Sequence, residues 1–132
     1  MEENELTQAF ISESLEMLDE AEPKIVALQE LGSGELPLET LNAIFRLFHS
    51  IKGSAGFLNF SHITAVTHNA ETFLDMLRKG KISLKQEDIS LLCSATDLLR
   101  KLVENVSTTG SDSGYEDEEQ EIVRLLKDCL LY

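Results

Sequence analysis

Apolar residues recur at intervals of three and four along almost the whole chain of 132 residues, and no stretch keeps the alternation of a β-strand. Most glycines, together with the second proline, fall at the breaks between the periodic stretches. We therefore expect five helices, over about residues 5–31, 38–58, 61–80, 85–106 and 116–131. Because the breaks between neighbouring helices are short, we predict an all-α fold: an antiparallel up-and-down four-helix bundle with an additional C-terminal helix.

The length and the composition of the connections predict one domain over residues 1–132. The four-helix bundle would occupy about residues 5–106. Residues of about 107–115 are rich in serine, threonine and glycine, which is typical of a linker. The extra helix, about 116–131, begins with an acidic run, whose negative charges interact favourably with the positive N-terminal end of the helix dipole.

Three single residues predict details of the helix ends. Pro23 lies inside the first helix and predicts a kink or a break there, because proline lacks the amide hydrogen and clashes with the preceding turn. Asn59 predicts a left-handed residue at the end of the second helix. Ser61 predicts the N-terminal cap of the third helix.

The net charge of −13 argues against nucleic acid and anionic membranes as partners, and suits a partner with a basic face. No apolar run approaches the roughly 20 residues that a membrane span needs, and the acidic start is unlike a secretory signal. We therefore expect a cytoplasmic chain that does not insert into membranes. The cysteines, Cys93 and Cys129, are expected as buried small apolar side chains rather than as a disulfide or metal pair.

The second helix separates a core face from a face that holds His49. At about 100° per residue, the apolar stripe comprises Ile44, Leu47, Phe48, Ile51, Ala55 and Leu58. His49 lies on the opposite side, where it should face solvent. The residues that fall beside it, within about 60°, are Phe45, Arg46, Lys52, Gly53 and Gly56.

Two glycines inside a helix each cost about 1 kcal/mol relative to alanine. One interpretation is that Gly53 and Gly56, together with Phe45, form a clearing through which the active site of another protein reaches His49. The other is that they let a neighbouring helix approach closely, and the sequence leaves both open. Lys52, one turn after His49, is placed to neutralise a phosphoryl group on the imidazole.

The third helix brings two further polar residues to the height of His49. Its apolar stripe comprises Ile63, Val66, Ala70, Phe73, Leu74 and Leu77. His68 points away from this stripe, and Glu71 lies beside His68. Antiparallel packing about a turn near Asn59 places both level with His49. A carboxylate bound to one imidazole nitrogen leaves the other nitrogen free as a nucleophile.

Other kinds of site are disfavoured. The order His68-x-x-Glu71, pointing away from the core, is the reverse of what a bundle metal site requires, and we predict no metal. No glycine-rich phosphate loop and no nucleophile elbow occurs, so the chain has no evident place to bind ATP. His62, at a helix start, is given no role.

Residues 45–56, FRLFHSIKGSAG, resemble the phosphorylation motif of histidine-containing phosphotransfer (Hpt) domains, and more closely the N-terminal domain of chemotaxis histidine kinases of the CheA type. The pattern Thr67-His68-x-x-Glu71-x-x-Leu74-Asp75-x-x-Arg78-x-Gly80 is similar to the third helix of that domain. The resemblance covers about residues 6–106. Residues 57–60, Phe-Leu-Asn-Phe, replace a more glycine-rich turn of the family.

The resemblance implies that His49 accepts the γ-phosphoryl group of ATP from a separate histidine kinase catalytic domain and passes it to an aspartate of a response regulator receiver domain. Glu71 would orient the imidazole, and Lys52 and His68 would complete the polar network. The chain alone would be no enzyme, would bind no cofactor and would be monomeric. ATP and Mg²⁺ would be used by the kinase domain and the regulator. A stand-alone or hybrid-kinase Hpt protein, or a helical adaptor that is not phosphorylated, remains the alternative.

Overall fold

The computed structural model describes residues 3–31 and 37–131, and within them it holds five α-helices, one short 3₁₀ turn and no strand. The helices are α1 (Glu3–Gln29), α2 (Leu38–Phe57), α3 (Ser61–Arg78), α4 (Gln86–Thr109) and α5 (Glu116–Asp128), and the 3₁₀ turn spans Cys129–Leu131. The all-α prediction is confirmed. None of the described helices combines the length and the apolar composition that crossing a membrane requires.

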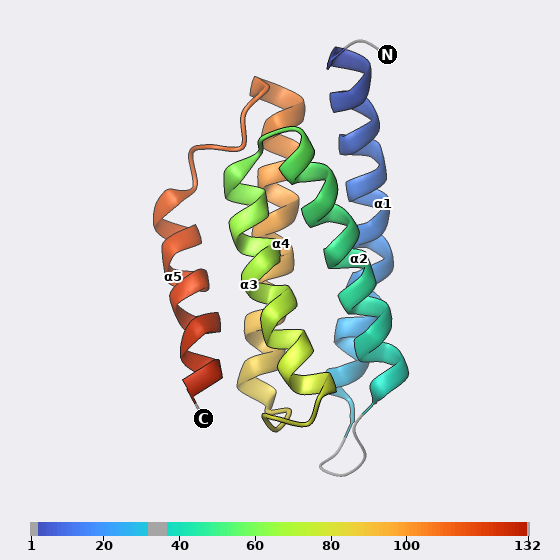
Figure 1. Cartoon of the computed structure of the whole chain (residues 1–132), viewed down its shortest axis with the longest axis vertical. Helices are drawn as coiled ribbons and strands as arrows, with labels where there is room; N and C mark the ends of the chain where they lie inside the picture. Colours follow the sequence, from blue (N-terminus) through green and yellow to red (C-terminus); the bar gives the residue numbers. More distant parts are fainter. Residues whose placement is uncertain (1–2, 32–36, 132) are drawn as a thin grey trace.

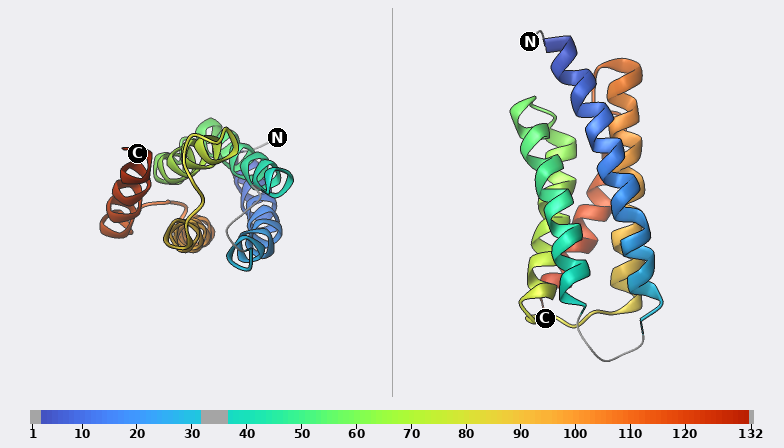
Figure 2. Two further views of the ribbon diagram at one scale, coloured as in Figure 1. Left: turned by 90° about the horizontal axis from the view of Figure 1, so that it is seen from below. Right: turned by 90° about the vertical axis from the view of Figure 1, so that its right-hand side faces the viewer.

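The first four helices alternate in direction and enclose a shared core (Figure 1). Viewed along the bundle, α2 lies between α1 and α3, and α4 closes the ring between α3 and α1 (Figure 2). The helix α5 packs outside this ring, against α3 and α4. The predicted up-and-down four-helix bundle with an added C-terminal helix is therefore confirmed.

The apolar stripes predicted for α2 and α3 form one side of the core. All six stripe residues of α3 are completely buried. On α2, Ile44, Phe48, Ile51 and Ala55 are buried, whereas Leu47 and Leu58 are half-buried. Because each buried aliphatic or phenyl side chain contributes about 1.5–3 kcal/mol, this seam fixes how α2 and α3 lie against each other.

The break predicted at Pro23 does not occur, because α1 continues through it from Glu3 to Gln29. Pro23 itself is exposed, whereas Ala21, Ile25 and Leu28 on either side of it are buried against the bundle. Packing on both sides of the proline keeps the helix continuous, since most helix stability in proteins comes from the buried face.

The prediction is confirmed at the end of α2 and wrong at the end of α4. Asn59 adopts a φ of 64° after α2, as predicted. The end of α4 was predicted at Val106, but the helix continues to Thr109, into the segment expected as linker. It ends at Gly110, whose φ of 81° suits glycine and whose amide donates to the carbonyl of Val106.

The cap predicted from Ser61 is wrong, because Ser61 is already helical and no side chain of the preceding residue caps α3. The cap comes instead from the α4–α5 connection. One carboxylate oxygen of Asp112, Oδ2, accepts the backbone N–H groups of His62 at 2.9 Å and of Ile63 at 3.0 Å. The buried Asp112 thus satisfies two free donors at the positive end of the α3 dipole.

Cys93 and Cys129 are both free and half-buried, packed against the core. Burial, followed by the nearby carboxylate of Asp88, raises the pKa of Cys129 to about 11, and the Cys129 thiol donates to Asp88 at 3.3 Å. Burial likewise raises the pKa of Cys93. Both thiols are therefore protonated at neutral pH and poorly reactive, which agrees with the apolar packing role expected for them.

Candidate functional site

His49 stands on the side of α2 opposite its core stripe, and 62% of its side chain is exposed. The residues on either side of it, Phe48 and Ser50, show the division of the helix: Phe48 is completely buried and Ser50 is exposed. The prediction that His49 faces solvent is confirmed. A reactive group in another protein has direct access to this imidazole.

Glu71 on α3 meets His49 across the helix pair. Its Oε1 lies 2.6 Å from Nδ1 of His49, and only 9% of its side chain is exposed. An ionised carboxylate is only an acceptor, so Nδ1 carries the hydrogen and donates it. The other ring nitrogen, Nε2, consequently keeps its lone pair. The structure therefore holds the neutral imidazole of His49 in the tautomer whose nucleophilic atom is Nε2.

Lys52 approaches the second oxygen of the same carboxylate, with Nζ 2.7 Å from Oε2 of Glu71. The contact is an ion pair by distance, although Oε2 is buried and accepts no well-directed hydrogen bond. Burial by itself would raise the pKa of Glu71, but Lys52 and His49 outweigh it and lower the pKa below its usual value. Glu71 is therefore ionised at neutral pH, as the tautomer assignment requires.

Phe45 lies one turn before His49, and the two rings stack at 6.0 Å between centroids with planes 9° apart. The guanidinium carbon of Arg78 sits 3.7 Å from the centroid of Phe45. Arg78 also donates to Asp75 at 2.8 Å and to Asn42 at 3.2 Å. Phe45, which was predicted to belong to the clearing, thus fills space beside the imidazole and restricts the plane of the ring.

His68 does not join this network. It is exposed on α3, and its side chain makes no hydrogen bond or ion pair with any other residue that the structure describes. Of the four polar residues predicted together, the structure brings together His49, Lys52 and Glu71. The fourth stands one turn away because His68 precedes Glu71 by three positions and points to solvent.

Gly53 and Gly56 decide between the two interpretations left open by the sequence. Both are exposed, and a Cβ atom built on either would meet nothing within 4 Å. No neighbouring helix approaches them, so the close-packing interpretation is wrong. The open surface beside His49 agrees with a clearing for a partner.

His62 belongs to a second cluster that sequence reasoning missed. Its Nδ1 lies 2.6 Å from Oε1 of Glu119, and its Nε2 lies 3.8 Å from Oε1 of Glu116. Burial would lower the pKa of His62, but the hydrogen bond with Glu119 and the surrounding carboxylates raise it above its usual value. These contacts hold α5 against the start of α3. The acidic run at 116–121 was the available signal, but the sequence does not show which residue it faces.

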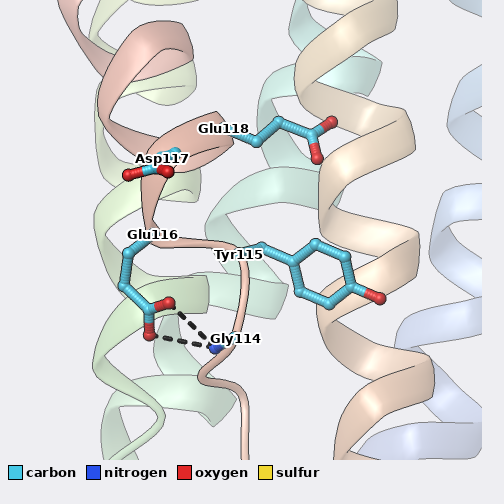
Figure 3. Close-up of a pocket in the computed structure, with 5 residues that line it drawn as sticks. All are labelled: Gly114, Tyr115, Glu116, Asp117 and Glu118. Carbon is cyan, nitrogen blue, oxygen red and sulfur yellow. Dashed lines mark hydrogen bonds between the residues drawn. The ribbon is translucent and has the colours of Figure 1, made fainter.

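A shallow pocket opens at the start of α5, lined by residues 114–118 (Figure 3). Both carboxylate oxygens of Glu116 accept the backbone N–H of Gly114, at 2.9 and 3.1 Å. The pocket is separate from the His49 site, because α3 lies between α5 and α2 (Figure 2). Within the described part of the chain, no three His, Cys, Asp or Glu residues are placed to hold a metal ion.

Comparison with known sequences places this site in a family. The model of the family described as "Hpt domain" matches residues 5–109. The "Sensor histidine kinase CheAY" of Helicobacter pylori is 36% identical over 125 residues, which cover 93% of this chain and 15% of that protein. The "Chemotaxis protein CheA" of Rhizobium meliloti is 33% identical over 118 residues, covering 89% and 15%. The chain thus spans about 15% of the length of these curated relatives.

Two solved structures share the fold. The phosphorylated P1 domain of CheA3 in complex with CheY6 from R. sphaeroides superposes with a TM-score of 0.79 at 23% identity, covering 95% of this chain and 98% of that one. The solution structure of the histidine phosphotransfer domain of CheA gives 0.76 at 25% identity, covering 92% and 91%. The helix order, the exposed His49 and the family match agree, and the chain belongs to the Hpt domain family.

Proposed function

We propose that this chain is the phosphotransfer domain of a CheA-type histidine kinase. In it, His49 accepts a phosphoryl group from ATP through a separate kinase domain and passes it to an aspartate of a response regulator. One observation carries the proposal: an exposed imidazole whose Nδ1 is bound, at 2.6 Å, to a buried and ionised glutamate. The names of the relatives, and the regulator bound to the P1 domain of CheA3, support the same partners.

The chemistry follows from the free lone pair on Nε2. This nitrogen attacks the γ-phosphorus of ATP, the new N–P bond forms, and the bond to the bridging oxygen breaks so that ADP leaves with its electron pair. The phosphorylated ring then carries a positive charge shared with Nδ1–H. Glu71, whose own side chain is only 9% exposed, lies against that hydrogen and stabilises the charge.

In the transfer to the regulator, Nε2 of His49 is the leaving atom instead of the attacking atom. A carboxylate oxygen of the receiver attacks the phosphorus, the N–P bond breaks, and its electron pair returns to Nε2. The ammonium group of Lys52, one turn after His49, is placed to meet a phosphoryl oxygen while it stays paired with Glu71. His68 has no part in either step.

ATP and Mg²⁺ belong, in this proposal, to the kinase domain and the receiver, and the setting is the cytoplasm. The chain presents a nucleophile and a surface, and each partner supplies its own phosphate-binding and metal-binding groups. The chain alone should therefore not label itself with ATP. The kinase domain would lie elsewhere in the longer protein.

The test is labelling of the chain by the catalytic domain of the parent kinase with Mg²⁺ and γ-labelled ATP. We expect an acid-labile label on the wild type, none on His49→Gln, and normal labelling of His68→Gln, which is a matched exposed histidine on the neighbouring helix. Both variants should melt close to the wild type, because neither side chain is in the core. Label retained on His49→Gln, or self-labelling of the pure chain, would contradict the proposal.

A further inference from the structure

The end of α2 beyond His49 presents a large apolar side chain to water. Phe57, the last residue of that helix, is 75% exposed, more than any other large apolar residue that the structure describes. The others with substantial exposure are Val26, Leu31, Leu38 and Leu131. An exposed phenyl ring contributes nothing to the core, and it marks an interaction surface only together with its neighbours on α2.

Helical geometry places Phe57 and His49 on the same side of α2. They are eight positions apart, which is about 12 Å along the helix axis and about 80° around it. Gly53 and Gly56 occupy the turns between, and neither carries a side chain that would stand between a partner and the helix. We define the surface made by Arg46, His49, Gly53, Gly56 and Phe57 as the α2 strip.

The α2 strip differs in charge from the rest of the domain. The chain carries a net charge of −13, whereas α2 holds two basic residues, Arg46 and Lys52, and one acidic residue, Glu39. Lys52 is paired with Glu71. Arg46 is exposed, one turn before His49, and forms no ion pair with any of the residues described. The strip thus offers a free cation beside the imidazole and an apolar ring about two turns further on.

We propose that Phe57 is the apolar anchor by which a response regulator receiver domain docks on the α2 strip, with Arg46 facing the receiver's acidic phosphate-accepting site. This rests on the proposed function, because an aspartate that takes the phosphoryl group must reach Nε2 and so must bring its own anionic surface over α2. The free cation suits that charge. A receiver domain seated over His49 would also reach Phe57, about 12 Å further along the helix.

The receiver, rather than the kinase domain, is the partner that needs such an anchor. In the proposed function the kinase domain belongs to the same longer protein, and tethering gives it a high effective concentration without tight contacts. The receiver is a separate chain and depends on its own affinity. Buried aromatic residues are where interfaces concentrate that affinity.

The test compares three variants of the 132-residue chain: Phe57→Ala, Arg46→Ala and the control Val26→Ala, which truncates an exposed apolar residue on α1. The receiver of the regulator encoded with the parent kinase is titrated into each by calorimetry. We expect Phe57→Ala to weaken binding roughly 10- to 100-fold. Arg46→Ala should weaken it less, by an amount that shrinks as salt rises. Val26→Ala should bind normally.

Transfer kinetics and labelling separate this inference from the function on which it rests. Phe57→Ala should be labelled by the kinase domain and melt like the wild type, and its transfer should be slow at low receiver concentration but normal at saturation. Unchanged receiver affinity, an equal loss in Val26→Ala, or an equal loss of kinase labelling would overturn the anchor. If the wild type itself is not labelled, the proposed function fails, and the titration still decides whether Phe57 binds the receiver.

Discussion

Oε1 of Glu71 lies 2.6 Å from Nδ1 of His49, although Glu71 is on α3 and buried while His49 is on α2 and exposed. The contact depends on the antiparallel seam between the two helices, which sets the two residues at one height. Burial alone would raise the pKa of this carboxylate, but its pairing with Lys52 and His49 lowers the pKa, so Glu71 stays ionised and fixes the hydrogen on Nδ1. In the proposed function, Glu71 would thus prepare the nucleophile without taking the phosphoryl group itself.

Replacing Glu71 by alanine should slow phosphorylation of His49 by on the order of 10²-fold, because the ring loses the group that selects its tautomer and stabilises its positive charge. Nitrogen NMR of the imidazole should show a shift from one tautomer to a mixture. Glu71→Gln is the matched control: an amide oxygen still accepts from Nδ1–H but carries no charge, so it should keep the tautomer and lose part of the rate. Unchanged nitrogen shifts in the alanine variant would mean that Glu71 does not set the tautomer.

Bulk placed at Gly53 or Gly56 should block transfer without harming the fold. A Cβ at either position meets nothing within 4 Å, so alanine should stabilise the domain by up to about 1 kcal/mol through helix propensity, and leucine should be tolerated. The leucine side chain would nevertheless stand where a partner approaches His49. Thermal melts and transfer rates on the same variants check this. Leucine variants that lose stability yet transfer normally per folded molecule would argue against a clearing.

The cap that Asp112 provides should be measurable. Asp112→Ala removes the acceptor of two backbone N–H groups at the start of α3, and we expect a loss of about 1 kcal/mol in the free energy of unfolding. Ser61→Ala should change it by less than about 0.5 kcal/mol, because Ser61 does not cap the helix. Denaturant titrations of both variants compare the two positions. A larger loss in Ser61→Ala would show that the local serine is the cap after all.

The sequence predicts features that helical periodicity determines, but it misses the contacts of His62 and Asp112 and wrongly assigns a cap to Ser61. The core stripes, the exposure of His49 and the bridge to Glu71 follow from helical periodicity and one antiparallel turn, so they were predictable. Asp112 reaches α3 across about 50 positions of sequence, and His62 meets Glu119 across 57. Such contacts depend on where α5 docks, which no local pattern encodes. The contact between the guanidinium of Arg78 and the ring of Phe45 could not be predicted from a local pattern either.

The tertiary structure explains why the predictions for Pro23 and His68 were wrong. The helix α1 runs through Pro23 because buried residues on either side hold it, which local propensity does not report. His68 stays outside the network because it lies three positions before Glu71 on α3 and points to solvent. The resemblance to the family placed His68 in that network, and the geometry of this chain does not.

The His62 cluster should make stability depend on pH. The pKa of His62 is raised above 6.5 in the folded chain, so protonation binds the folded state more tightly than the unfolded one. The stabilisation is therefore fully present below about pH 6.5 and is lost as the pH rises through the raised value. The difference in free energy of unfolding between the wild type and His62→Gln should be larger at pH 6 than at pH 9. An equal difference at both values would contradict a charged His62.

In the proposed function, the phosphoryl group is carried on Nε2 of His49 because Glu71 occupies Nδ1. The direct measurement is NMR of the chain after phosphorylation by the kinase domain, with phosphorus and ring-nitrogen signals assigned in the folded protein. We expect a single phosphohistidine, at residue 49, with the phosphorus bonded to Nε2 and the hydrogen retained on Nδ1. Phosphorus on Nδ1, or on any residue other than His49, would contradict it.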